Sequence, residues 1–303
     1  MKSSHLPRPL ARRSFVGLAA GAVAVLAAPR AMRAAPAPRL TIGLSQYSLK
    51  ALFAAKQLDP LDYPAFARKE FGLTELDLWE GGLPPDRLDD DRYLSDLRRR
   101  AKDAGTHLFL LMAGVVDATG GSGKAPKKAK PADHLRSIER CAVLGCQYLR
   151  LFVSAPEGDR ATAVTRCAEA LAPLADRAKA GGITIAIEPG ASAHTQDGAF
   201  LAEIMQQLRH SHCRLMPDFG KLRGDIYEGT RAMMPYASVI SAKTHEFDAA
   251  GNQVEFDYFR LMKIIATAGF KGIVAIEWEG KKLEPVAGVH ASKKLIERAL
   301  AAL

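Results

Sequence analysis

The chain has 303 residues, of which 48% are hydrophobic and 25% charged, a balance typical of a soluble folded enzyme rather than of a disordered protein. The formal net charge of +9 is concentrated at the N-terminus, because residues 1–39 hold seven of the 42 Lys and Arg residues and no acid. The remainder has 35 basic and 33 acidic residues, and a net charge near +2 gives no reason to expect nucleic-acid binding.

Residues 1–37 have the pattern of an export signal. Arg12 and Arg13 precede an apolar run over 16–28, and small residues and prolines follow to Pro38. This segment resembles a twin-arginine signal, so we expect cleavage between Ala31 and Ala37 and a periplasmic destination. The apolar run is shorter than the roughly 20 residues of a membrane span. Membrane contact is therefore expected only through an uncleaved signal.

From Leu40 onward, short apolar strands alternate with amphipathic helices. Strands are expected over 40–47, 71–79, 106–114, 147–155, 183–190, 214–220, 239–247 and 273–280. Helices are expected over 63–71, 84–105, 133–144, 159–180, 198–208, 227–236, 256–267 and 292–302. Eight such units predict a single closed (β/α)8 TIM barrel over 40–303, an α/β fold with a parallel sheet. No Gly-x-Gly-x-x-Gly motif follows the first strand, which disfavours a dinucleotide-binding fold.

A polar segment rich in Gly and Lys, residues 117–131, interrupts the alternation. It reads either as a surface loop or as a lid over the barrel mouth, with Lys residues available to an anionic substrate. It lacks the spacing of a phosphate-binding loop.

Four polar residues recur at the ends of the last four strands. They are Glu188, Asp218, His245 and Glu277, at intervals of 30, 27 and 32 residues, and a βα unit occupies about 30 residues. The C-terminal strand ends of a barrel surround one pocket, so these side chains are expected to converge. Three neighbouring carboxylates would repel one another unless a cation lay between them. The alternative is a set of salt bridges from these acids to Arg150, Lys221 and Lys243.

Oxygen ligands with one imidazole suit a divalent metal, Mn²⁺ first and Mg²⁺, Co²⁺ or Zn²⁺ as alternatives. Glu188, Asp218, His245 and Glu277 are therefore the candidate metal ligands. Open coordination positions would remain for substrate oxygens.

The segments GLSQYSL, GLTELDLW, LRLF, IAIEPG, MPDFGK, SAKTHEFD and IVAIEWEG, in this order, resemble the xylose isomerase-like barrels known as sugar phosphate isomerases/epimerases. The resemblance covers the chain from about Leu40 to its end. It implies one divalent metal held by the carboxylates of strands five, six and eight and by a residue of strand seven, often His. Matched by position, these are again Glu188, Asp218, Glu277 and His245.

Two departures from the family pattern stand out. Lys221 occupies the place of a His that commonly follows the strand-six Asp by three residues. The strand-seven His usually stands where this chain has Ser241. Alternation would place Ser241, Lys243 and His245 on one face, so His245 is expected either to reach the metal or to touch the substrate instead.

The implied chemistry is isomerisation or epimerisation of a keto-sugar or sugar derivative. A sugar carbonyl and its neighbouring hydroxyl would chelate the metal, and Glu188 and Glu277 would act as catalytic base and acid on an enediolate. Trp79 is expected either to stack on a sugar face or to lie in the core. The candidate substrate-binding residues are Gln46, Asp77, Trp79, Arg150, Lys221, Lys243 and Glu279.

Other functions stay open at this point. The same site could carry out a lyase or dehydratase reaction on an oxidised, 3-keto glycoside, which suits an exported protein. A non-catalytic sugar-binding module is the alternative from another class. Barrels of this family that cut DNA need further strand-end His ligands and a basic groove, which this sequence lacks. The expected partner is a small carbohydrate, and a homo-oligomer is compatible with the sequence.

Overall fold

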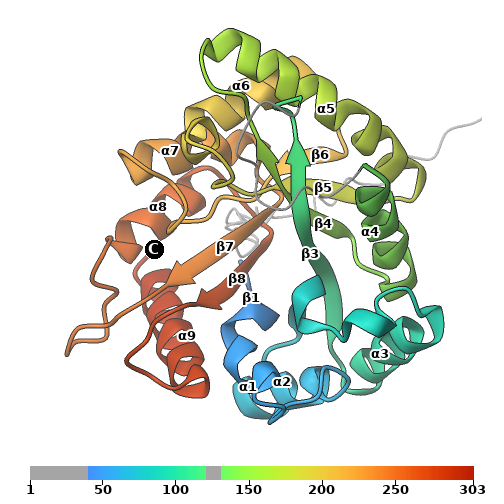
Figure 1. Ribbon diagram of the computed structural model, residues 1–303. Helices are drawn as coiled ribbons and strands as arrows, with labels where there is room; N and C mark the ends of the chain where they lie inside the picture. The colour runs from blue at the N-terminus through green and yellow to red at the C-terminus, as the bar shows by residue number, and fades with distance from the viewer. Residues whose placement is uncertain (1–39, 121–130) are drawn as a thin grey trace, which may run out of the picture. The chain divides into compact units, whose positions relative to one another are not determined.

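The computed structural model describes residues 40–120 and 131–303, in which eight parallel strands form one curled sheet surrounded by helices (Figure 1). The strands are β1 (Thr41–Leu44), β2 (Glu75–Trp79), β3 (His107–Asp117), β4 (Tyr148–Ser154), β5 (Thr184–Ile187), β6 (Cys213–Leu215), β7 (Val239–Thr244) and β8 (Ile273–Trp278). Strands β1 to β6 pair in chain order, and β8 pairs with both β1 and β7. The predicted (β/α)8 barrel is confirmed. The signal segment and residues 121–130 of the predicted lid lie outside the described residues.

The sheet closes between β6 and β7 through two parallel bridges, Leu215 to Ala237 and Asp218 to Ser241. The Ser241 N–H donates to the Pro217 carbonyl at 2.9 Å. Proline has no N–H to donate, and β6 ends two residues before it. The closing bridge therefore joins a strand to a loop residue, and it brings Asp218 against the inner face of β7.

The helices are α1 (Lys50–Ala54), α2 (Tyr63–Phe71), α3 (Asp91–Asp103), α4 (Pro131–Leu144), α5 (Arg160–Ala180), α6 (Gly198–Leu208), α7 (Ile226–Met233), α8 (Tyr258–Thr267) and α9 (Pro285–Ala301). One capping device recurs along the chain. An aspartate side chain accepts a backbone N–H at the start of α3, α5, α6, α7 and α8. Each cap satisfies donors that have no partner within the helix, and an anion there favours the helix dipole.

Several predicted boundaries differ from the structure, and three of the differences have a clear local cause. Strand β1 ends at Leu44, because the Ser45 hydroxyl accepts the Tyr47 N–H and the chain turns into a 3-10 helix over Gln46–Leu49. Helix α3 begins at Asp91, after the Asp90 cap, rather than near residue 84. Helix α9 begins at Pro285, seven residues before its predicted start, because proline is well suited to the first helical turn.

Two apolar clusters hold the barrel together. The larger contains side chains from the strands and from the helices around them. The smaller is Phe109, Leu110, Met112, Ala186, Met216, Val239 and Ala275. It draws on β3, β5, β7 and β8, and strands from opposite sides of a barrel meet only in its interior. The smaller cluster therefore fills the barrel beneath the strand ends that carry the predicted site. Within the described residues, no helix is both long enough and apolar enough to cross a membrane.

Helices α6 and α7 approach each other closely at two glycines. A Cβ on Gly198 would lie 2.2 Å from the Gly229 carbonyl oxygen. A Cβ on Gly229 would instead lie 3.3 Å from the Leu222 side chain and 3.7 Å from the Gly198 nitrogen, an ordinary contact distance. We expect Gly198→Ala to lower the free energy of unfolding by about 2 to 3 kcal/mol, because backbone must move to admit the methyl group. Gly229→Ala, the matched control, should change it by less than about 1 kcal/mol, because improved helix propensity offsets a small shift of Leu222. Urea unfolding measures both, and equal losses would contradict this account of the contact.

Candidate functional site

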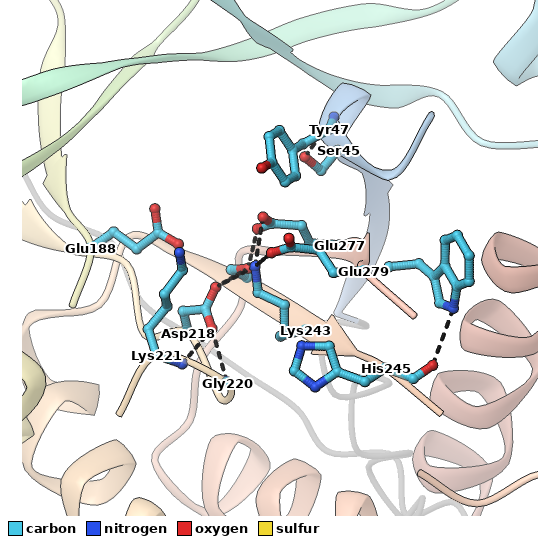
Figure 2. Close-up of polar contacts among 12 residues, drawn as sticks. Ser45, Tyr47, Glu188, Asp218, Gly220, Lys221, Lys243, His245, Glu277 and Glu279 are labelled. Atoms are coloured by element: carbon cyan, nitrogen blue, oxygen red, sulfur yellow. Dashed lines mark hydrogen bonds and ion pairs between the residues drawn. The ribbon is translucent and has the colours of Figure 1, made fainter. Parts of the chain in front are cut away.

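Three carboxylates converge at the C-terminal ends of β5, β6 and β8. Glu188 follows β5 directly, Asp218 lies three residues after β6, and Glu277 is the next-to-last residue of β8. One oxygen from each lies within 4.8 Å of the others, and all three residues are buried. Figure 2 shows them directed toward one centre. The structure thus brings together three of the four predicted ligands.

Asp218 is held by donors on both of its oxygens. Its Oδ1 accepts the N–H groups of Gly220 at 2.8 Å and Lys221 at 3.0 Å, and its Oδ2 accepts the Ser241 hydroxyl at 2.8 Å. Burial alone would raise the pKa of Asp218. The Lys243 ammonium and the hydrogen bonds from Glu188 and Ser241 outweigh burial and hold that pKa below its usual value. These contacts therefore favour the anionic form of Asp218.

Glu188 pairs with Arg150, which β4 supplies. The Arg150 Nε lies 2.9 Å from Glu188 Oε2, and its Nη1 donates to the Ala113 carbonyl at 2.7 Å. Burial raises the pKa of Glu188 well above its usual value, the nearby Asp218 and Glu277 raise it further, and Arg150 offsets only part of this. Glu188 is therefore suited to take up a proton.

A chain of ion pairs runs outward from Glu277. The Lys243 Nζ lies 2.7 Å from Glu277 Oε1, also contacts Glu279, and is 3.4 Å from Asp218 Oδ2. Glu279 in turn pairs with Lys50 at 3.0 Å. The predicted alternative of salt bridges at the strand ends is thus present for Arg150 and Lys243, and both bridges use the carboxylates proposed as metal ligands.

The three carboxylates suit a divalent ion as hard oxygen donors that lie close together and out of water. No His or Cys from the described part of the chain joins them. Lys243 already places a positive charge against two of the three. The donor set therefore fits a metal, but it shares its oxygens with an ammonium of the chain itself.

His245 lies outside the carboxylate group. Its Nδ1 is 2.8 Å from Glu255 Oε2, and its backbone carbonyl accepts the Trp278 indole N–H at 3.2 Å. Strand β7 ends at Thr244, so the alternation that places Ser241 and Lys243 inside the barrel does not extend to His245. Its role as a ligand stays a prediction.

On the other side of the barrel, Gln46 and Asp77 form a buried polar pair. The Gln46 N–H donates to Asp77 Oδ1 at 2.9 Å, and the Gln46 Oε1 accepts the Trp79 N–H at 2.7 Å. The Gln46 Nε2 and Asp77 Oδ2 have no partner among the described residues. Burial, reinforced by Glu277, raises the pKa of Asp77 well above its usual value and favours its neutral form, in which the carboxyl group can donate as well as accept.

Trp79 lies at the mouth, next to these polar groups. The Trp79 and Tyr47 rings pack edge to face, with their centroids 4.8 Å apart. The Gly81–Gly82 backbone lies against the indole, so any side chain on Gly81 would collide with the ring. A cavity of about 740 Å³ opens beside it, and its walls include Lys50, Phe53, Leu58, Trp79, Gly82 and Leu83. The carboxylates do not line this cavity, which is linked to them through Lys50 and Glu279.

The last predicted contact, Lys221, points toward Glu188 in Figure 2, and its Nζ lies 5.5 Å from the centre of the Phe152 ring. Sequence reasoning did not place Lys50 or Tyr47 in the site. Both residues lie just past β1, and Tyr47 falls in the stretch that was expected to be strand. The ion pair between Lys50 and Glu279 joins residues that are 229 positions apart in the sequence. No local pattern in the sequence signals a contact of that separation.

Comparisons with known proteins agree on the fold. A family model described as "Xylose isomerase-like TIM barrel" matches residues 66–303. No curated protein matches significantly. Among solved structures, an IOLI protein with a bound zinc atom has 15% identity and a TM-score of 0.66, covering 87% of this chain and 99% of its own. An L-ribulose 3-epimerase has 17% identity and a TM-score of 0.63, and the match covers 87% of this chain and 95% of the epimerase. The 3-keto-D-glucoside 4-epimerase YcjR from E. coli has 12% identity and a TM-score of 0.65, and the match covers 86% of this chain and 100% of YcjR.

Glu279 gives the site a measurable dependence on pH. Burial would raise its pKa, but Lys243 and Lys50 outweigh burial and lower the pKa from 4.5 to about 2. Because the folded-state pKa is below the unfolded value, this stabilisation is fully present above about pH 4.5 and is lost as the pH falls toward 2. After allowance for solvent screening, we expect Glu279→Gln to cost about 1 to 2 kcal/mol at pH 7 and progressively less in acid.

Urea unfolding between pH 7 and pH 3 measures this difference. Glu157→Gln, at an exposed residue, is the control and should follow the wild type throughout. A loss for Glu279→Gln that stays constant from pH 7 to pH 3 would show that the ion pairs are not its source.

Proposed function

Because the chain belongs to the xylose isomerase-like TIM barrel family, we propose that it is a divalent-metal-dependent isomerase or epimerase of a keto-sugar or sugar derivative. The observation that carries the proposal is the convergence of Glu188, Asp218 and Glu277, buried and within 4.8 Å of one another. Two of the solved structures with this fold are named as sugar epimerases, which supports a carbohydrate as the substrate.

Glu188, Asp218 and Glu277 would hold the ion, Mn²⁺ first and Mg²⁺, Co²⁺ or Zn²⁺ as alternatives. When bound, the ion would polarise the sugar carbonyl and stabilise the charge that develops as the neighbouring proton leaves. His245 lies near this group without joining it, so we assign it to the substrate rather than to the ion.

The proton transfers fall to Glu188 and Glu277. Glu188 directly follows β5 and Glu277 lies on β8, so they approach a bound sugar from different sides. One carboxylate removes the proton next to the carbonyl, and the other returns a proton to the opposite face to give the epimer. Return of the proton to the former carbonyl carbon, with the proton of the neighbouring hydroxyl passing to the former carbonyl oxygen, instead exchanges aldose and ketose. The raised pKa of Glu188 suits a group that must gain and lose a proton near neutral pH.

The sugar hydroxyl groups would meet polar atoms on the remaining strands. The unpartnered atoms of Gln46 and Asp77 can donate to them, and Trp79 offers an apolar ring at the mouth. We assign Lys221, Lys243 and Glu279 to further hydroxyl contacts. Arg150 is held by Glu188 and Ala113, and it would act mainly by orienting Glu188.

A lyase reaction is the second candidate, and the cavity beside Trp79 favours it. Phe53, Leu58 and Leu83 give that cavity apolar walls, which suit the non-sugar substituent of a glycoside better than sugar hydroxyls. If a 3-keto glycoside binds with its substituent there, loss of the substituent from the same enolate would compete with return of the proton.

Export remains part of the proposal. It rests on Arg12 and Arg13 and on the apolar run after them. A periplasmic enzyme would meet glycosides rather than intracellular sugar phosphates, and the choice of substrates for testing follows from this.

Exchange of a carbon-bound proton with solvent tests the proposed chemistry whichever product forms. The full chain with Mn²⁺ is incubated in D₂O with ketohexoses and with a 3-keto-glucoside, and deuterium next to the carbonyl is followed by NMR. We expect the wild type to incorporate deuterium into at least one of these sugars. Glu188→Gln and Glu277→Gln should slow incorporation by at least about 100-fold, since each removes a proton-transfer group.

Glu228→Gln, on the exposed surface of α7, is the control and should exchange at the wild-type rate. Exchange with an unchanged carbon skeleton supports the isomerase or epimerase, and release of the substituent supports the lyase. Saturable sugar binding without any exchange would favour a non-catalytic sugar-binding module.

A further inference from the structure

Lys243 is an unusual residue to find in a group of metal-binding carboxylates. It is 1% exposed, its Nζ lies 2.7 Å from Glu277 and 3.4 Å from Asp218, and it also contacts Glu279. An ammonium group has three donors and no acceptor, so three surrounding carboxylates match its bonding capacity. Two of the three carboxylates assigned to the ion are thus already neighbours of a fixed cation.

Ser241 completes this arrangement from the same face of β7. Its Oγ lies 2.8 Å from Asp218 Oδ2 and 2.7 Å from Glu277 Oε2. Both oxygens of Asp218 and both oxygens of Glu277 therefore have a hydrogen-bonding neighbour within the chain. Because the serine side chain is short and uncharged, it leaves room for the Lys243 ammonium beside the same two carboxylates. The Ser241 hydroxyl and the Lys243 ammonium thus lie between Asp218 and Glu277.

The charge of Lys243 is secured by its surroundings. Burial works against the ammonium, but Asp218, Glu277, Glu188 and Glu279 together raise the pKa of Lys243 well above its usual value. Glu279 differs from the other three because it lies outside the metal-binding group and also pairs with Lys50. An ammonium that left Asp218 and Glu277 would therefore keep a carboxylate partner.

We propose that Lys243 is a built-in competitor of the divalent ion. Its ammonium balances the carboxylates when the ion is absent and weakens binding of the ion, and Glu279 retains the ammonium when the ion binds. This inference rests on the proposed function, because it assumes that an ion binds to Glu188, Asp218 and Glu277.

Metal affinity at a fixed pH of about 7 tests the inference independently of activity. The full chain is freed of metal, and Mn²⁺ and Mg²⁺ are titrated by calorimetry into the wild type, Lys243→Met and the control Lys263→Met, at an exposed residue of α8. Lys243→Met should bind Mn²⁺ at least about tenfold more tightly than the wild type, a difference of about 1.4 kcal/mol. Lys263→Met should match the wild type.

Thermal unfolding gives a second readout. Metal-free Lys243→Met should melt below the wild type, because the buried Asp218 and Glu277 lose their counter-ion. Added Mn²⁺ should raise the Tm of the variant by more than it raises that of the wild type. Lys243→Gln, which keeps a hydrogen-bond donor, serves if the Met variant does not fold. Failure of both variants to fold with Mn²⁺ supplied would overturn the inference, since the ion would then be unable to replace the ammonium.

The remaining outcomes separate the inference from the proposed function. If the wild type and both neutral variants bind one ion with equal affinity, or the variants bind it more weakly, the competition is refuted and the metal site stands. If none of the three binds an ion, the inference and the metal-dependent function fail together.

Discussion

The structure depends on how buried negative charge is balanced at the C-terminal ends of β5 to β8. Glu188, Asp218 and Glu277 are brought within 4.8 Å of one another away from water, where like charges repel strongly. Arg150 and Lys243 supply the opposing charges, and each is itself buried and hydrogen-bonded. Neither basic residue would be tolerated there without the acids. The cations and the carboxylates are therefore one interdependent unit.

The contact between Asp218 and Ser241 both closes the barrel and fixes the geometry of the site. The bridge from Asp218 to Ser241 completes the circle of strands, and the Ser241 side chain then links Asp218 to Glu277. A change in the β6–β7 contact would therefore move two carboxylates relative to each other. This dependence explains why a loop residue after a three-residue strand can occupy a fixed position in the site.

The repeated spacing of strand-end residues was enough to predict the barrel and the convergence of the three acids, because a βα unit has a nearly constant length. Local alternation was not enough for His245, since it applies only while the strand continues, and β7 ends one residue earlier. The contact from Lys50 to Glu279 arises from the pairing of β1 with β8, the first strand with the last, and has no local signature. Spacing was therefore sufficient for the three acids, whereas the position of His245 depends on where β7 ends and that of Lys50 depends on a distant contact.

The two sides of the pocket differ in charge in a way that suits a sugar. On β4 to β8 the acids are paired with Arg150 and Lys243, whereas near β1 and β2 the raised pKa of Asp77 favours a neutral carboxyl group, which accepts the Gln46 backbone N–H. A second carboxylate anion there would add to the repulsion that Lys243 and Arg150 already offset. A neutral Asp77 avoids this and gains a proton to donate to a hydroxyl group. The buried ion pairs thus gather on the side where proton transfer is proposed, and Gln46 and Asp77 on the other side can bind hydroxyl groups by neutral hydrogen bonds.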